Sequence, residues 1–539
     1  MDYLKIGKAT ELNGKDRRLY RRLEMLPAIL SWGTLIILLI GSYFKPIWIA
    51  YFIIAFDVYW LLLVLYLGLY LFFAYRKLKQ NIKIDWREKC QKLISSPQCL
   101  LTFNPTLGRE EEANDKCLAK NNMNWEDVIH LIFFPTYNEG LDVIRPSFQA
   151  LIDDGYPADK MIVVLAIEGR AGQEARTRAE TIKKEFGPKF KDFIITVHPD
   201  LTGELKGKGA NQAWAAKEVK EKIIDKQGLD YDKILVSVFD IDTVVQSGYF
   251  FCLTYRFLTV ANPYQASYQP VPVYHNNIWQ APFFARVAAT SNTFWQMMQQ
   301  IRQEKLATYS SHSMTWRALV DIGFWSTTMV SEDSRVFWHC LLYYKGDYRV
   351  EPLHFPVSMD VTMDENFRQT AKSLYKQQRR WGWGVENIPY LIFNVIKKWP
   401  ELPKKQMISK VMVQLYGFHS WATNALIIGV IGWMPMILGG DRFNITVLSG
   451  NLPVVTRYLM TIAMVGLVFS AIVSTLLLPK KVQKYGFVKR ILMILQWAIL
   501  PFSIIFFGAI PGLEAQTRLM LGKYMGFWVT PKKREARSV

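Results

Sequence analysis

Long apolar segments lie near both ends of the 539-residue chain, and shorter apolar segments alternate with polar ones between them. Residues 26–44 and 47–74 form the first two long segments, and 411–438, 453–478 and 491–510 form the last three. Each approaches or exceeds the roughly 20 residues that one helical crossing of a membrane needs. The pattern predicts a helical hairpin near the N-terminus and a second group of membrane-spanning helices near the C-terminus.

In the middle of the chain the apolar segments are shorter and alternate with polar or amphipathic ones. Short strands are expected at 128–134, 161–167, 193–197 and 234–239, with helices near 145–152, 173–186 and 208–225. Strands that alternate with helices in this way are typical of a parallel sheet covered by helices on both faces. We therefore expect an α/β domain inserted between α-helical transmembrane segments.

These patterns divide the chain into six expected parts. They are a cytoplasmic segment with two transmembrane helices (1–80), a polar connector (81–124), the cytoplasmic α/β domain (125–385), an interfacial amphipathic segment (386–410), a C-terminal transmembrane region (411–520) and a basic cytoplasmic tail (521–539).

Basic residues gather beside the apolar segments. The formal net charge is +19, although 50% of the residues are apolar and 21% are charged. This placement favours contact with anionic membrane lipids and a cytoplasmic position for both flanks of the first hairpin. It also weighs against nucleic acid as a partner, because the basic residues do not form a single arm or patch.

The charges of the C-terminal loops predict a topology that conflicts with three simple crossings. The loop at 479–490 is basic and should lie inside, whereas the loop at 439–452 should lie outside. Three crossings would then leave the basic tail outside. We therefore expect Pro501 to break the last apolar segment into a re-entrant hairpin, which returns the tail to the cytoplasm.

Two carboxylates follow the fourth expected strand. Asp240 and Asp242 stand one residue apart directly after 234–239, where ligands of open α/β sheets collect. Paired carboxylates at such a place can bind Mg²⁺ or Mn²⁺. A solvated turn is the ordinary alternative for an isolated pair. The motifs that follow in order, and the membrane segments after them, favour the metal site.

Polar residues also follow the first two expected strands. Pro135, Tyr137 and Glu139 lie in the turn after the first strand, which can offer backbone amides and a carboxylate to a ligand. Glu168 follows the second strand, and its carboxylate can accept a hydrogen bond from a base or ribose. It can equally form a surface ion pair with Arg170, and both roles remain open.

Further candidates lie at the starts of two expected helices. Lys208, between two glycines, opens a helix after the third strand, and a lysine at such a place favours a diphosphate. A basic helix start is nonetheless common. Glu332 and Asp333 follow Ser331 before an apolar helix. Ser331 can cap this helix. Asp333 can act as a general base that takes a proton from an acceptor hydroxyl.

Gln377, Arg380 and Trp381 stand at i, i+3 and i+4, so they share one face of a helix. A guanidinium can bind phosphate through two hydrogen bonds, and an indole can stack on a sugar ring. The alternative is that the Arg and Trp side chains lie at a membrane surface.

This ordered set of motifs, from about residue 128 to 381, resembles the family-2 glycosyltransferases with a GT-A fold. More narrowly, it is similar to the membrane-integrated branch that includes bacterial cellulose and hyaluronan synthases. The motif Gln377-x-x-Arg380-Trp381 is the most specific part of the resemblance.

The resemblance implies a role for each candidate residue. Asp240 and Asp242 would hold a nucleotide sugar through Mg²⁺ or Mn²⁺, and Asp333 would be the catalytic base. The diphosphate would contact Lys208, Gln377 and Arg380, and Trp381 would lie under the acceptor sugar. The substrate site would be completed by Pro135, Tyr137, Glu139, Glu168 and Glu332. The family often has an Asp pair where this chain has Glu168. The nucleotide base is therefore open, with UDP as the default.

We expect a multi-pass enzyme of the plasma membrane with a cytoplasmic catalytic domain. It would be an inverting glycosyltransferase that moves a sugar from a nucleotide-sugar donor to a growing polysaccharide in a processive manner. The alternatives are a non-processive transferase with a lipid-linked acceptor and a non-catalytic scaffold that binds a sugar nucleotide. Asp57, Gln414, His419 and Asn424 are candidates for a polar path through the helices, although Asp57 can equally be a hydrogen-bonded packing residue.

Overall fold

The computed structural model describes residues 2–93, 123–478, 487–532 and 534. The chain forms two compact units, each built from separate stretches of sequence. The helical unit comprises Met1–Arg76, Asn277–Ile301 and Val361–Lys533, and the sheet unit comprises Lys77–Asn276, Arg302–Asp360 and Arg534–Val539.

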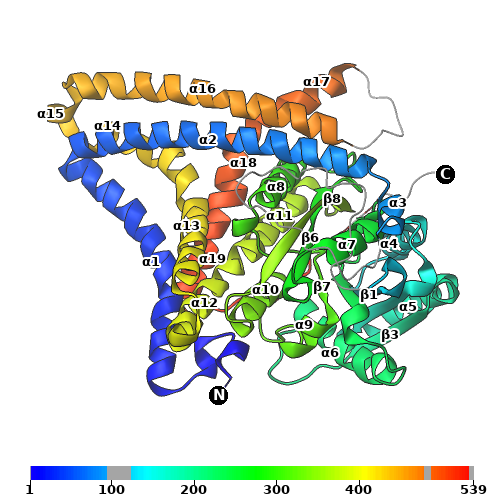
Figure 1. Cartoon of the computed structure of the whole chain (residues 1–539). Helices are drawn as coiled ribbons and strands as arrows, with labels where there is room; N and C mark the ends of the chain where they lie inside the picture. The colour runs from blue at the N-terminus through cyan, green and yellow to red at the C-terminus, as the bar shows by residue number, and fades with distance from the viewer. Residues whose placement is uncertain (1, 94–122, 479–486, 533, 535–539) are drawn as a thin grey trace. The chain divides into compact units, whose positions relative to one another are not determined.

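The sheet unit is built on an eight-stranded mixed sheet with the strand order β3-β2-β1-β4-β7-β6-β8-β5 (Figure 1). The strands are β1 (Ile129–Thr136), β2 (Met161–Glu168), β3 (Asp192–His198), β4 (Ile234–Val238), β5 (Val244–Val245), β6 (Ala266–Tyr274), β7 (Ser313–Thr315) and β8 (Arg349–Met359). Strands β1 to β4 pair in parallel, whereas β7 runs antiparallel to β4 and to β6. The carboxyl ends of the four parallel strands therefore share one edge, called here the carboxyl edge.

Helices pack on both faces of the parallel strands. The helices of this unit are α3 (Trp86–Gln91), α4 (Leu141–Asp153), α5 (Gly172–Phe186), α6 (Lys208–Val219), α7 (Tyr249–Thr259), α9 (Trp316–Asp321) and α10 (Glu332–Tyr343). Phe134 of β1 contacts Phe148 of α4, and the neighbouring Phe133 contacts Trp325. Since successive side chains of a strand point to opposite faces, β1 is buried on both sides, as its continuous apolar sequence predicts.

The four strands and three helices expected from the apolar pattern are present. The structure adds β6 and β8, which pair in parallel with a register shift between Gln269 and Val271. Prolines at 270 and 272, and at 352 and 356, interrupt their sequences. Because proline cannot donate a ladder hydrogen bond, these segments do not look like strands in the sequence.

The helical unit contains most of the long apolar helices. Its helices are α1 (Gly14–Phe44), most of α2 (Pro46–Lys83), α8 (Phe283–Ile301), α11 (Phe367–Gly382), α12 (Asn387–Lys397), α13 (Lys404–Gly429), α14 (Met434–Leu438), α15 (Gly440–Asn444), α16 (Val447–Leu477), α17 (Phe487–Leu495), α18 (Leu500–Ile504) and α19 (Ile510–Met520). Within the described residues, four helices are long and apolar enough to span a membrane, namely Gly14–Phe44, Pro46–Lys83, Val447–Leu477 and Ile491–Met520. A bent pair, Lys404–Gly429 with Ile431–Leu438, would make a fifth span if it crosses as one.

The predicted re-entrant hairpin at Pro501 is wrong. The chain stays helical from Ile491 to Met520, and a 41° bend occurs instead in the pair that ends at Leu438. Pro501 stands in the first turn of α18, where a missing N–H costs little. A 3₁₀ turn before it and a π turn after it adjust the hydrogen bonding without reversing the chain.

Polar side chains of the helical unit bind one another between helices. Asp57 of α2 is buried and accepts a hydrogen bond from Thr456 of α16 at 2.7 Å. Ser31 of α1 donates to Gln516 of α19 at 2.7 Å and lies 3.4 Å from His419 of α13. Asp57 therefore has the hydrogen-bonded packing contact that the sequence left as one of its two alternatives.

Parts of three sequence predictions lie outside the described residues. They are residues 94–122 of the connector, residues 479–486 of the basic loop, and residues 533 and 535–539 of the tail.

Candidate functional site

Lys208 forms the centre of an acidic cluster at the carboxyl edge. Its Nζ lies 2.8 Å from Asp240 Oδ1, 3.0 and 2.9 Å from the two oxygens of Asp333, and 4.0 Å from Glu332 Oε1. The lysine is the first residue of α6, Asp240 follows β4, and the two other acids begin α10. The fold thus gathers four candidate residues that lie up to 125 positions apart in the sequence.

Three carboxylates lie within 4.0 Å of the Lys208 ammonium. Burial alone would lower the pKa of Lys208, but Asp240, Asp333 and Glu332 outweigh burial and raise that pKa, so the ammonium keeps its proton. One ammonium therefore faces three carboxylates. The arrangement favours a further cation near Asp240, whose side chain is 27% exposed.

Gly209 allows the two helix starts to approach each other. A Cβ atom at this position would lie 2.7 Å from the carbonyl oxygen of Ser326 and 3.1 Å from the Cβ of Glu332. Any larger residue would push α6 away from the start of α10. The glycine beside Lys208 is therefore needed for packing within the cluster.

A segment before β7 contacts the same acids. Ser310 donates to Asp240 Oδ2 at 2.7 Å, and Thr308 donates to the backbone carbonyl of Asp333 at 2.6 Å. His312 is buried with its Nδ1 3.9 Å from Asp333 Oδ1. Burial lowers the pKa of His312, so its imidazole is neutral at pH 7. No motif marks these residues, because their place depends on the antiparallel pairing of β7 with β4.

Asp242 lies in a second acidic pair rather than against Lys208. It is 1% exposed, and its Oδ2 accepts the backbone N–H of Asp360 at 2.9 Å. Arg534, from the C-terminal tail, donates to Asp360 Oδ1 at 2.7 Å and to the carbonyl of Asp142 at 3.3 Å. Burial and Asp242 raise the pKa of Asp360, while Arg534 acts in the opposite direction. Asp360 follows strand β8, so a search for acids after strands would have found it once β8 was recognised.

The turn after β1 holds its own carboxylate. Glu139 Oε2 accepts hydrogen bonds from Thr136 Oγ1 and from the backbone N–H of Tyr137, both at 2.8 Å. Pro135 is inside β1. The guanidinium of Arg170 lies 4.5 Å from the centre of the Tyr137 ring. Glu139 therefore shapes the turn, and the ring of Tyr137 is held by a cation–π contact.

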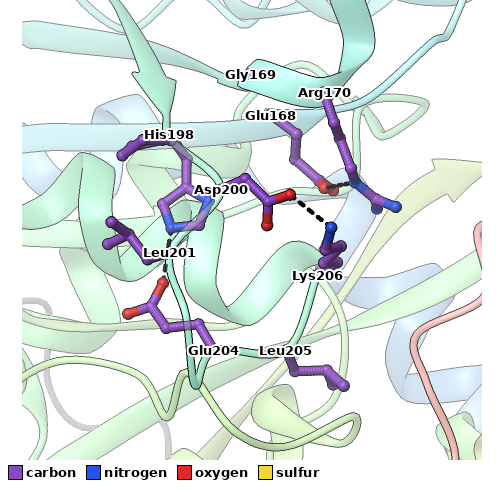
Figure 2. Close-up of a pocket in the computed structure, with 10 residues that line it drawn as sticks. Glu168, Gly169, Arg170, His198, Asp200, Leu201, Glu204, Leu205 and Lys206 are labelled. Atoms are coloured by element: carbon purple, nitrogen blue, oxygen red, sulfur yellow. Dashed lines mark hydrogen bonds and ion pairs between the residues drawn. The ribbon is translucent and has the colours of Figure 1, made fainter.

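Glu168 forms the ion pair that the sequence allowed. Arg170 Nε donates to Glu168 Oε2 at 2.5 Å, and both line a small pocket with the segment 198–206 (Figure 2). Figure 2 also shows His198 bound to Glu204 and Lys206 bound to Asp200. The pocket volume is about 10 Å³, which is room for one water molecule at most. In this conformation the charged residues of the pocket bind one another.

Gln377, Arg380 and Trp381 all lie on helix α11, which belongs to the helical unit. Gln377 Oε1 accepts a hydrogen bond from Thr362 at 2.7 Å, and Arg380 stacks on Phe527 at 5.0 Å. The nearby Trp383 is 1% exposed and donates to Glu386 at 2.7 Å. This tryptophan is thus a packing residue rather than one exposed at a membrane surface.

The residues present fit a hard divalent cation as partial ligands. Among the described residues, no group of three or more His, Cys, Asp and Glu side chains is arranged to hold a metal ion. Mg²⁺, however, commonly takes one or two carboxylates together with substrate phosphates and water. The partly exposed carboxylate of Asp240, beside Lys208, is the structural feature that suits such an ion.

Comparison with known proteins identifies the family. Residues 235–510, just over half of the chain, match the family described as Glycosyl transferase family group 2. Among curated proteins, none matches this chain.

Two solved structures resemble the chain at low identity. The mannosyltransferase PcManGT from Pyrobaculum calidifontis, solved with GDP-Man and Mn²⁺, is 13% identical, with a TM-score of 0.40 over 77% of this chain and 99% of its own. Residues 1–349 of S. aureus TarS are 10% identical, with a TM-score of 0.31 over 65% of this chain and 91% of that one.

The family match covers the three acids of the cluster and most of the C-terminal helices, but not Lys208. It begins in β4, includes Asp240 and Asp333, and ends at the start of α19. The mixed sheet between apolar helices agrees with the α/β GT-A fold class expected from the sequence. The chain therefore belongs to the glycosyl transferase family group 2 and is a glycosyltransferase.

Proposed function

We propose that the protein is a membrane-bound inverting glycosyltransferase of the cellulose synthase and hyaluronan synthase-like branch, with a nucleotide sugar as donor and a UDP-sugar as the default. The observation that carries this proposal is the cluster of Lys208 with Asp240, Glu332 and Asp333 at the carboxyl edge of the sheet. It combines a candidate base, a candidate diphosphate ligand and a candidate metal ligand within one set of contacts.

In the proposed reaction, an acceptor hydroxyl oxygen attacks the anomeric carbon of the donor. The bond between this carbon and the diphosphate oxygen breaks, the nucleoside diphosphate leaves, and Asp333 takes the hydroxyl proton. Attack from the face opposite the leaving group inverts the anomeric carbon. Lys208 donates to both oxygens of Asp333, so it orients the carboxylate before the donor arrives.

Charge stabilisation of the leaving diphosphate falls to Lys208, Arg380 and Gln377 in this proposal. Asp240 and Asp242 would hold Mg²⁺ or Mn²⁺, which when bound neutralises charge on the diphosphate. Trp381 would lie under the acceptor sugar. Pro135, Tyr137, Glu139, Glu168 and Glu332 would shape the donor site, with Arg170 released from Glu168 if that carboxylate binds the ribose or base.

The acceptor has two candidates. The sequence favours processive growth of a polysaccharide. A non-processive transfer to a lipid-linked acceptor gains support from the helical unit, where Asp57 and His419 engage neighbouring helices and the cavity described below is apolar. The length of the product distinguishes the two.

We further propose that the protein resides in the plasma membrane with the sheet unit in the cytoplasm. If the four long apolar helices each cross once and the bent pair does not, both ends of the chain lie on the same side, which agrees with the basic residues that flank the first and last apolar segments. Reaction of a single introduced cysteine in the sheet unit with an impermeant reagent, in sealed cells and after lysis, tests this orientation.

The function is tested with purified protein in lipid nanodiscs, a panel of UDP- and GDP-sugars, and Mg²⁺ or Mn²⁺. We expect metal-dependent release of nucleoside diphosphate from one donor. Asp333→Asn should lower kcat by about 10²–10⁴-fold, the usual contribution of a general base. Asp153→Asn, at an exposed acid on α4, is the matched control and should retain the rate. Release that survives Asp333→Asn at the full rate would contradict the assigned base.

A further inference from the structure

The helical unit contains an apolar cavity beside the helix that carries Gln377, Arg380 and Trp381. Its volume is about 510 Å³, within the roughly 300–1,000 Å³ of ordinary ligand sites. Helices α8, α11 and α18 line it together with the π turn and the start of α19 that follow. On α11 the lining residues are Ala371 and Tyr375.

The lining suits a hydrocarbon and not water or a sugar. Eight of its ten residues are Phe, Ile or Ala, and the exceptions are Ser503 and Tyr375. The Tyr375 hydroxyl is bound to Glu514 at 2.7 Å. Water in such a space would lack hydrogen-bond partners. A glycan would likewise lose its hydration without replacement.

The mouth of the cavity is also apolar. Phe502 and Phe506 line it and are 65% and 55% exposed. Both lie in the helix Ile491–Met520, which is long and apolar enough to span a membrane. Exposed phenylalanines in such a helix face lipid, so a chain can enter this cavity from the bilayer.

A basic face of α11 borders the cavity residues. Arg368, Lys372, Lys376 and Arg379 stand at i, i+4, i+8 and i+11, so they form one stripe along the helix. Arg368 lies three positions before Ala371, and Lys372 lies three positions before Tyr375. Arg368 and Lys372 are both exposed, whereas Arg379 pairs with Glu514 at 2.7 Å. An anionic headgroup would therefore meet positive charge next to the cavity.

We propose that this cavity holds the hydrocarbon chain of a lipid-linked acceptor, with the acidic headgroup beside Arg368 and Lys372. The inference rests on the proposed function, because it concerns the acceptor of the same reaction. It applies equally to transfer of one sugar and to extension of a glycan that stays attached to its lipid. It names a phosphate-linked glycolipid as the acceptor class.

The direct test labels the cavity of the unmodified protein. The probe is a sugar linked through phosphate to a hexadecyl chain that carries a diazirine near its middle. After photolysis in nanodiscs, mass spectrometry should find the label on peptides of α11 and of residues 499–510. A phosphatidylcholine with a diazirine in the same chain position serves as the reference. Equal labelling by the two lipids would mean that bulk lipid fills the cavity, and it would overturn the proposal.

Variants that fill the cavity give an independent test of the acceptor site. The first variant is Ala371→Phe and the second is Ser503→Phe. Each should lower labelling by the acceptor probe and raise the KM for the phosphate-linked acceptor at least tenfold. The KM for the donor should change less than twofold. Ala498→Phe, at an exposed position one residue before the lining residue Ile499, is the matched control and should change neither.

The outcomes separate this inference from the proposed function. If the unmodified protein releases no nucleoside diphosphate from any donor, the function fails, whatever the labelling shows. If release is normal and the filled variants keep the acceptor KM and the labelling of the unmodified protein, the cavity is not the acceptor site. Labelling of the unmodified protein decides the question even if neither variant folds.

Discussion

Replacement of Lys208 by methionine removes the ammonium that contacts Asp240, Glu332 and Asp333, and keeps a similar side-chain volume. At about 2.9 Å and an effective dielectric constant of 20, each close pair represents roughly 6 kcal/mol of gross attraction. Desolvation offsets most of this energy. Removal of one partner from a buried ion pair typically costs about 3–5 kcal/mol, because the other charges stay buried.

The expected effect is a large loss of thermal stability of the sheet unit. For a domain of roughly 150–250 residues, 1 kcal/mol shifts Tm by about 2–4 °C. Lys208→Met should therefore lower Tm by roughly 6–20 °C at pH 7.5. Mn²⁺ should also stabilise the variant more than the unmodified protein, since the ammonium no longer competes for Asp240.

The measurement is unfolding of purified protein in nanodiscs, followed by tryptophan fluorescence at one scan rate. Lys206→Met is the matched control, because this lysine pairs with Asp200 at 2.5 Å but both side chains are more than half exposed. Surface pairs contribute only about 0–1 kcal/mol. A Tm for Lys208→Met equal to that of Lys206→Met would refute the reasoning that the Lys208 ammonium stabilises the partly buried cluster of acids.

Three further predictions concern single residues. Gly209→Ala should destabilise the sheet unit by about 1–3 kcal/mol, because the added Cβ would lie 2.7 Å from a backbone oxygen. The control Gly450→Ala, with nothing within 4 Å of the added Cβ, should not destabilise the protein. Equal Tm values for the two variants would contradict this prediction. Arg380→Lys should lower kcat/KM at least tenfold if the guanidinium binds diphosphate in a forked manner, and an unchanged value in donor titrations would exclude that role. Burial raises the pKa of Asp154 to about 7. Between about pH 4 and 7 the unfolded state therefore loses a proton that the folded state keeps, and stability should fall with rising pH in that window. In measurements of Tm against pH, Asp154→Asn should flatten this slope.

Apolar periodicity was enough to predict the parallel half of the sheet, because β1, β2 and β4 are short apolar runs buried on both faces and β3 is a half-buried apolar run. It also placed Asp240 at a strand end and Gln377, Arg380 and Trp381 on one helix. The contacts of Asp242 could not be predicted from apolar periodicity. They depend on where β8 ends, and β8 is a proline-interrupted strand whose neighbour β6 lies about 80 residues away in the sequence.

Ser310 and Arg534 escaped prediction for the same physical reason. Ser310 binds the candidate acid Asp240, and Arg534 binds Asp360. Both contacts depend on tertiary pairing that brings together segments 70 and 174 residues apart. Local patterns report the period of a strand or helix, but they carry no information on which distant segment packs beside it. The roles of the site residues therefore stay predictions, although the positions of several are now described.

The sheet unit is discontinuous, and this has a consequence for its biosynthesis. The chain leaves this unit at Asn276 and returns at Arg302 after supplying α8 to the helical unit. A ribosome adds roughly 5–20 residues each second, so the partner strands β7 and β8 and the acid Asp333 emerge some seconds after Lys208 and Asp240. During that interval β4 has an open edge and Lys208 lacks two of its three acids. Nascent chains that stop before residue 333 should therefore be protease-sensitive in this region, and chaperones that shield exposed strand edges should bind them first.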